Sequence, residues 1–176
     1  ILVAVVGATT GGTGMTSFGS ILFYLVAYGF ATVAAFAVVT MVRDSAGEVH
    51  AISGWAGLGR RNPLLAGIFA VLMLSFAGIP LTGGFIGKWA VFSAAWRGGY
   101  SWLVLAAVAL SLVAAYVYLR VIVAMFFAEP VTGVAVGRAS GMNWVPVAVG
   151  ALASAYLGLF PGPLLDLVTS ASTFLR

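Results

Sequence analysis

The stretch LSFAGIPLTGGFIGK, from Leu74 to Lys88, decides how this chain folds. Its middle part, GIPLTGG, cannot be a regular helix, because Pro80 lacks a backbone donor and clashes with the preceding turn, and the glycines add freedom to leave helical dihedrals. The sequence is apolar and helical in pattern on both sides, from Pro63 to Ala77 and from Phe85 to Trp96. We therefore predict an interrupted helix, and the residues assigned to the interruption are Gly78, Ile79, Pro80, Thr82, Gly83 and Gly84.

The composition of the whole chain places this interrupted helix in a membrane. Of its 176 residues, 62% are hydrophobic and only 7% are charged, whereas a soluble domain carries roughly 25% charged residues. The mean hydropathy is +1.15. The apolar runs are continuous, which favours helices over barrel strands, where apolar and polar residues alternate. We predict an all-α membrane protein, a polytopic bundle of transmembrane helices in contact with the lipid bilayer.

Charge, cysteine and histidine counts exclude several other classes. The formal net charge is +4, but the basic residues are scattered apart from Arg60 and Arg61, whereas nucleic-acid binding needs a basic face. The chain has no cysteine, and therefore no disulfide, thiolate chemistry or iron–sulfur ligation. Its one histidine, His50, cannot form a zinc site alone. We expect no nucleic-acid partner and no metal site.

The chain reads as a single transmembrane domain. Ile1 opens inside an apolar run without an initiator Met or a signal-peptide flank, so we expect a piece of a longer chain with further helices before it. Asn62 and Asn143 are the expected N-caps, and Pro63 suits the first helical position. The expected elements are a partial helix at 1–8, helices at 18–42, 63–96 (broken at 78–84), 101–127 and 143–160, a terminal helix at 164–175, and a 43–62 loop with a short interfacial helix from His50 to Leu58.

The segment 63–96 is either two helices joined by a tight turn or one crossing with an unwound middle. Halves of about 22 Å and 18 Å cannot each span a core of about 30 Å, whereas together they can. The lengths favour one crossing, which places the side richer in arginine in the cytoplasm and the C-terminus outside. Charge counting gives the same four-to-two split for both topologies; for one crossing the sides are Arg43, Arg60, Arg61 and Arg138 against Arg97 and Arg176.

Lys88 is the residue to which we assign the chemistry. It follows the break by one helical turn, near mid-bilayer, where a charge costs about 2.5–3.5 kcal/mol on insertion scales. Snorkelling to the surface is the structural alternative, but apolar sequence on both sides makes that reach poor. No Asp or Glu of this sequence lies in a predicted span. Desolvation and the N-terminal dipole of the resumed helix favour the neutral amine, while the carbonyls of the first half oppose them. We predict reversible protonation.

Other polar residues are weaker candidates. The ordinary role of each is interfacial anchoring or hydrogen bonding between helices. Arg120 is expected to snorkel toward the nearby interface, and His50 to be solvated or interfacial. The residues that could extend a hydrated path are Tyr24, Tyr28, Ser75, Ser111, Tyr116 and Tyr118.

The sequence from Gly57 to Gly99 closely resembles one protein family. Its core matches a family pattern of serine, small residues, Gly-Ile-Pro, then Gly-Phe-x-Gly and a charged residue. Further similarity lies in AAYVYLRVIVAMFF (114–127) and NWVPVAVGALASAYLGLFPGPLLDLV (143–168), with mild departures at Leu81, Gly83 and Val117. In these motifs the chain resembles the antiporter-like membrane-arm subunits of NADH-quinone oxidoreductase (respiratory complex I). Among these subunits, it resembles those of type N most.

The resemblance implies a function that the residues alone do not give. The chain would be the C-terminal portion of an inverted-repeat fold with two discontinuous helices, and Lys88 would match the lysine of the second, at the outer proton half-channel. It would hold no cofactor, because NADH, FMN, iron–sulfur clusters and quinone would lie on partner subunits. It would contact other membrane-arm subunits in a bacterial inner (plasma) membrane, where electron transfer elsewhere drives proton pumping through Lys88.

The sequence is also compatible with other functions. Multisubunit sodium/proton antiporters and membrane-bound hydrogenase complexes share the Gly-Ile-Pro…Gly-Lys core, although Arg-Arg-Asn-Pro, Tyr-Leu-Arg and the terminal Pro-x-Pro favour complex I. A purely structural membrane-arm subunit would use the broken helix for packing alone. A standalone secondary antiporter would exchange ions, protons or sodium, without a redox partner.

Overall fold

The computed structural model describes residues 3, 5, 17–44, 47–130, 133–136 and 141–173, and these are mostly helical. The predicted all-α class is confirmed for this part of the chain. The predicted helix at 1–8 lies outside the described residues except for Val3 and Val5, as do Arg138 and Arg176. The helices are α2 (Ser17–Met41), α3 (Leu58–Arg61), α4 (Pro63–Ala77), α5 (Gly83–Arg97), α6 (Ser101–Phe127), α7 (Gly141–Leu159) and α8 (Gly162–Thr173), with a 3-10 helix, η2 (Ile52–Trp55).

Three of the described helices are long and apolar enough to cross a membrane. They are α2, α6 and the Met142–Leu159 part of α7. The 25 residues of α2 rise about 37 Å and the 27 residues of α6 about 40 Å. Helix α4 is apolar too, but its 15 residues rise only about 22 Å. The chain is therefore a membrane protein with several helical spans.

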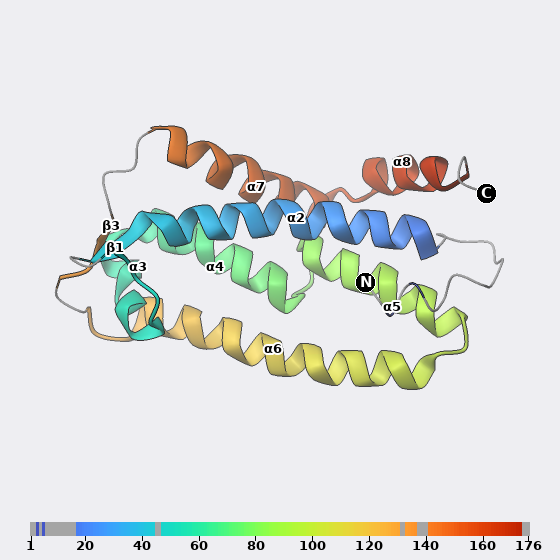
Figure 1. The fold of residues 1–176 in the computed structure, drawn as a ribbon, viewed down its shortest axis with the longest axis horizontal. Helices are drawn as coiled ribbons and strands as arrows, with labels where there is room; N and C mark the ends of the chain where they lie inside the picture. The colour runs from blue at the N-terminus through green and yellow to red at the C-terminus, as the bar shows by residue number, and fades with distance from the viewer. Residues whose placement is uncertain are drawn as a thin grey trace.

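Helices α4 and α5 together occupy the length of one long helix. Figure 1 shows α4 beginning at the end of the molecule where the strands lie, and α5 continuing toward the opposite end. Helix α2 runs beside both of them, and α6 lies along their other side. Helix α4 packs mainly against α6, while α5 packs mainly against α2 and α7. The junction of α4 and α5 consequently lies in the middle of the bundle.

The junction consists of residues 78–82. Gly78 ends α4 in the left-handed conformation, with φ of 83°, and its N–H bonds to carbonyls of the last turn. Thr82 begins α5, because its hydroxyl accepts from the N–H of Phe85 at 3.3 Å. The prediction that Gly83 and Gly84 belong to the non-helical break is therefore wrong: both lie in the first turn of α5, after its N-cap residue, Thr82.

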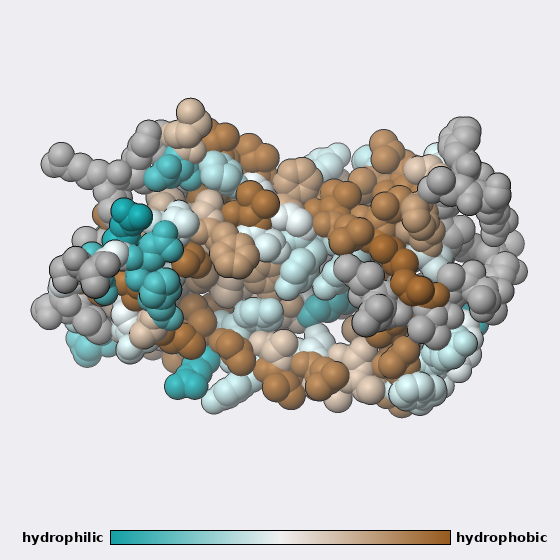
Figure 2. Space-filling view, viewed as in Figure 1, coloured by the Kyte–Doolittle hydropathy of each residue, from teal (hydrophilic) through white to brown (hydrophobic). Residues whose placement is uncertain are grey.

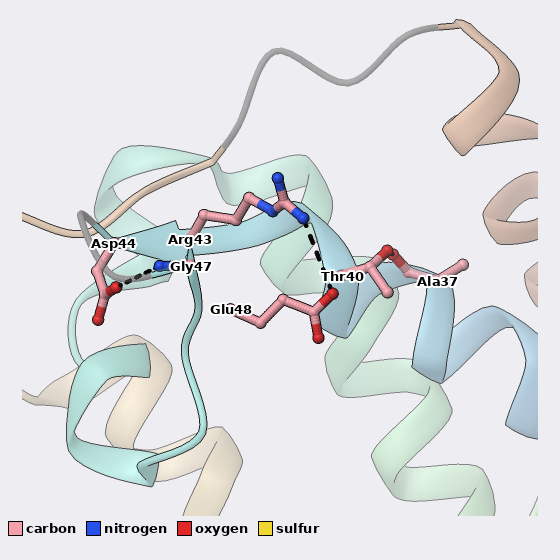
Figure 3. A network of polar contacts seen from close by, with 6 residues as sticks. All are labelled: Ala37, Thr40, Arg43, Asp44, Gly47 and Glu48. Carbon is pink, nitrogen blue, oxygen red and sulfur yellow. Dashed lines mark hydrogen bonds and ion pairs between the residues drawn. The ribbon is translucent and has the colours of Figure 1, made fainter.

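The predicted loop at 43–62 is instead folded, and together with residues 135–136 it forms a small unit that we call the cap. Strand β1 (Val42–Asp44) pairs antiparallel with β2 (Gly47–Glu48) and with β3 (Ala135–Val136), in the order β2-β1-β3. These strands have two or three residues, too few for an alternating pattern to be visible in sequence. Figure 3 shows Arg43 facing Glu48, with 3.9 Å between their charged groups, and Asp44 accepting from the N–H of Gly47 at 3.1 Å.

The short interfacial helix predicted from His50 to Leu58 is split in two. Gly57 lies between η2 and α3 in the left-handed conformation, with φ of 69°, and therefore interrupts any continuous helix. Its N–H donates to the carbonyl of Ala124 in α6 at 3.1 Å. Arg60 approaches Glu129 at 3.4 Å, and Arg61 donates to the carbonyl of Val134. The cap thus ties the end of α6 to the start of α4.

The helix starts differ in how well sequence predicted them. The Asn62 side chain accepts from the N–H of Leu65 at 3.1 Å and Pro63 follows it, as expected of an N-cap and a first helical position. Asn143 is not a cap, because α7 already begins at Gly141. Pro163 lies within α8, at its second residue, where a missing N–H costs nothing.

The core lies between α2, α4, α6 and α7. Val38, Leu65, Leu72, Met125 and Val147 are among its most deeply buried side chains, each at 0% exposure. Large apolar residues of α6 are exposed, as expected of a surface that faces lipid or further helices. Figure 2 shows hydrophilic residues gathered at the end with the strands, while apolar residues cover much of the remaining face.

Candidate functional site

Lys88 lies in the second turn of α5, with its amine against the end of α4. Its Nζ donates to the carbonyls of Phe76 at 2.8 Å and Ala77 at 3.0 Å. It also donates to the hydroxyl of Ser111 in α6, at 2.7 Å. An ammonium group has three N–H donors and no acceptor. Every donor of the charged form is therefore matched, although the side chain is only partly buried.

Backbone dipoles take the place of a counter-ion at this site. No carboxylate among the described residues pairs with Lys88; the ion pairs of Arg43 with Glu48 and of Arg60 with Glu129 lie at the cap. Phe76 and Ala77 are the last residues of α4, where carbonyls have no partner within the helix and the dipole is negative. The break exposes these carbonyls, so the interruption itself creates the acceptor site for the amine.

Gly78 makes room for the lysine. A Cβ at this position would lie 2.9 Å from Cδ and 3.1 Å from Nζ of Lys88. In the residue before the lysine, a Cβ at Gly87 would lie 3.3 Å from Cδ2 of Tyr24 in α2. The break thus leaves space for the lysine side chain, and α5 packs closely on α2 at the neighbouring residue.

Two buried serines join the elements around the break. The hydroxyls of Ser75 in α4 and Ser154 in α7 lie 3.1 Å apart, and each serine is 1% exposed. Ser75 Oγ also accepts from the N–H of Gly84 at 3.1 Å. A Cβ at Gly84 would lie 1.8 Å from the carbonyl oxygen of Ser75, so α4 and α5 meet where no side chain fits. Ser75 thus lies in this joint, without a hydrogen bond to the amine of Lys88.

Helix α7 packs closely against the break and against α2 through small residues spaced by four. A Cβ at Gly158 would lie 2.4 Å from the carbonyl oxygen of Leu81, and one at Gly150 equally close to that of Phe30 in α2. Ser154 lies between them on the same face. Sequence reasoning missed this role of α7, although small residues at i, i+4 and i+8 are the usual signal of close helix contact in membranes.

The predicted tyrosines fall into two groups. Tyr24 stacks on Tyr28 with ring centroids 5.3 Å apart, and Tyr28 contacts Phe76 at 5.1 Å. Phe76 in turn contacts Tyr118 at 5.7 Å, so these rings pack around the residue whose carbonyl accepts from Lys88. Tyr116 is 66% exposed on α6.

A cavity of about 720 Å³ lies between α5 and α6, and Lys88 and Ser111 line it. It reaches along α5 to Arg97 and contains no carboxylate among its lining residues. The lining is mostly aromatic and aliphatic, so its few polar groups would have to order any water that enters. The lining residues are Ala77, Gly78, Phe85, Lys88, Trp89, Phe92, Ser93, Trp96, Arg97, Val104, Val108, Ser111 and Leu112.

The described residues offer no site for a metal ion. No group of three or more His, Cys, Asp or Glu side chains comes together among them. The arrangement can hold a proton on the amine of Lys88, which donates to carbonyl acceptors and lines the cavity.

The sequence matches the family model described as NADH:quinone oxidoreductase/Mrp antiporter, TM, over residues 3–114. It is 52% identical over 177 residues to NADH-quinone oxidoreductase subunit N 3 of Streptomyces griseus, covering 100% of this chain and 31% of that protein. It is 52% identical over 156 residues to NADH-quinone oxidoreductase subunit N of Salinispora arenicola, covering 88% and 30%. The chain spans about a third of the length of these relatives.

A solved structure is also similar. In respiratory complex I from Thermus thermophilus with bound aureothin, one chain superimposes with a TM-score of 0.78 at 30% identity. The superposition covers 93% of this chain and 35% of that chain.

Proposed function

The chain belongs to the NADH:quinone oxidoreductase/Mrp antiporter family of transmembrane proteins, and from that premise we propose that it is the C-terminal portion of a subunit N of NADH-quinone oxidoreductase that translocates protons. Lys88 carries the proton in this proposal. The observation that supports it most is the placement of the Lys88 amine on two helix-end carbonyls and one hydroxyl, with no paired carboxylate among the described residues. An ionisable group inside a membrane bundle ordinarily marks an ion or proton pathway.

The hydrogen bonds favour the charged form, and loss of water from the site favours the neutral form. Such opposing effects suit a group that changes its protonation state during turnover. Rearrangement of the break would weaken the carbonyl contacts of Lys88 and promote release of the proton. Electron transfer on other subunits would drive that rearrangement.

We further propose that α4 and α5 form one discontinuous crossing of an inverted-repeat fold. Their 15 residues rise about 22 Å each, so neither helix alone spans a hydrocarbon core of about 30 Å, whereas the two in succession are long enough to do so. The cap carries Arg43, Arg60 and Arg61, which favours a cytoplasmic location for that end. Lys88 would then lie in the outward half of the crossing, and the C-terminus outside a bacterial inner membrane.

The proposed partners follow from the same assignment. The chain would bind other membrane-arm subunits and lipid, and partner subunits would hold NADH, FMN, iron–sulfur clusters and quinone. A multisubunit antiporter is the second candidate, because the matched family model covers Mrp antiporters as well. That candidate predicts sodium/proton exchange in vesicles without a redox partner.

Lys88→Met in the intact complex tests the proposal. We expect an assembled complex whose proton yield per electron, measured in vesicles, falls clearly below that of the natural complex. Arg120→Met is the matched control, because Arg120 is an exposed basic residue of α6 outside the site. A normal proton yield with Lys88→Met would overturn the proposal, and loss of assembly would favour a purely structural subunit.

A further inference from the structure

The three acceptors around Lys88 are chemically unequal. The carbonyl oxygens of Phe76 and Ala77 can accept a hydrogen bond but cannot donate one. The hydroxyl of Ser111, 2.7 Å from Nζ, can do both. Any change in the protonation of Lys88 therefore affects Ser111 differently from the two carbonyls.

The two protonation states of Lys88 need different hydrogen-bond partners. The ammonium form has three N–H groups for three acceptors, so every contact is satisfied. The neutral amine keeps two N–H groups and gains a lone pair, which needs a donor. A carbonyl oxygen facing that lone pair would be repelled, and a polar group left without a hydrogen-bond partner costs free energy. Among the three neighbours, only Ser111 can turn its O–H toward the lone pair.

We propose that Ser111 is the proton relay between Lys88 and the cavity along α5 and α6, and that its hydroxyl stabilises both protonation states of the lysine. This inference rests on the proposed function of Lys88. Ser111 and Lys88 both line that cavity, and the Ser111 hydroxyl is 2.7 Å from the amine, so it can exchange a proton with both the amine and water in the cavity. Its neighbours in the lining from α6 are Val104, Val108 and Leu112, which cannot accept or donate a proton.

The proton transfer balances with one water molecule. One N–H bond of the ammonium breaks and an O–H bond forms on Ser111, while the original hydroxyl proton passes to a water in the cavity. The electron pair of the broken N–H bond stays on nitrogen, serine remains a neutral hydroxyl, and hydronium carries the positive charge away. The O–H bond formed on Ser111 lies along the former N–H···O contact, so it donates to the lone pair of the amine without rotating.

Ser111→Ala in the intact complex tests the relay. We expect normal assembly and a rate of coupled proton translocation that is lower by at least about tenfold. A positioned proton-transfer group commonly contributes on the order of 10²–10⁴ in rate. Ser101→Ala is the matched control: Ser101 is a serine of the same helix, α6, but it does not line the cavity and makes no hydrogen bond to Lys88. We expect that control to pump at the natural rate.

A second pair of variants separates the hydroxyl from packing. Threonine and valine have nearly the same shape, so Ser111→Thr and Ser111→Val change the fit of α6 equally. Pumping that survives in Ser111→Thr and is lost in Ser111→Val would support the relay, whatever the alanine variant does to assembly. Equal pumping by the two variants would overturn it. If Ser111→Val pumps normally while Lys88→Met does not, only the relay fails; if Lys88→Met pumps normally, the proposed function itself fails.

Discussion

Gly84 illustrates how strongly a single position constrains the site. The carbonyl oxygen of Ser75 would lie 1.8 Å from a Cβ at Gly84, a distance that the backbone of α4 can relieve only by moving. That carbonyl belongs to the same helix end that supplies the acceptors of Lys88. Gly84 therefore sets the spacing between the lysine helix and its acceptors.

We predict that Gly84→Ala lowers the free energy of unfolding by about 1–3 kcal/mol, the usual cost of overpacking. Denaturant unfolding of the purified protein in detergent measures it. Gly67→Ala is the control, because nothing lies within 4 Å of a Cβ there and the position is helical. It should be neutral or stabilising by up to about 1 kcal/mol. Equal effects of the two substitutions would mean that the close contact at Gly84 is absent.

Lys88 could be identified from sequence, but its partners could not. A lone lysine near mid-membrane is unusual enough in any apolar sequence to be noticed. Its acceptors depend on where α4 ends and on which face of α6 packs against α5. Neither property can be predicted from the local sequence. The sequence indicates Ser111 only as one of several polar residues, and it gives no reason to select Ser154.

The helices were easier to predict than their junctions. The predicted 18–42 and the observed Ser17–Met41 differ by one residue at each end, because long apolar runs define membrane helices well. The break was predicted at 78–84 and lies at 78–82, because Thr82 caps α5 earlier than the glycines suggest. The cap sheet was missed, since each strand is held by long-range pairing of two or three residues.

The relation of α4 to α5 gives a prediction of its own. If they form one crossing, the cap and the α5–α6 turn lie on opposite sides of the membrane; if they form a hairpin, both lie on one side. The chain has no cysteine, so Ser53→Cys in η2 and Ser101→Cys at the start of α6 provide single labels. We expect a membrane-impermeant maleimide to reach Ser101→Cys from outside and Ser53→Cys only from the cytoplasmic side. Labelling of both from the same side would contradict one crossing.

In the whole bundle, the break is held from every neighbouring element. The serine joint connects α4, α5 and α7, the rings of Tyr28, Phe76 and Tyr118 connect α2, α4 and α6, and the cap fixes the ends of α4 and α6. A rearrangement that weakens the carbonyl contacts of Lys88 must therefore also disturb the serine joint, the ring contacts or the cap.

In the proposed function, Lys88 releases its proton and does not merely carry a positive charge. Lys88→Arg separates the two properties, because an arginine side chain keeps a positive charge and does not deprotonate in proteins. The measurement is the number of protons translocated per electron by the intact complex in sealed vesicles. We predict that Lys88→Arg gives a yield as low as Lys88→Met. A yield equal to that of the natural complex would contradict the account, because a fixed charge would then be sufficient.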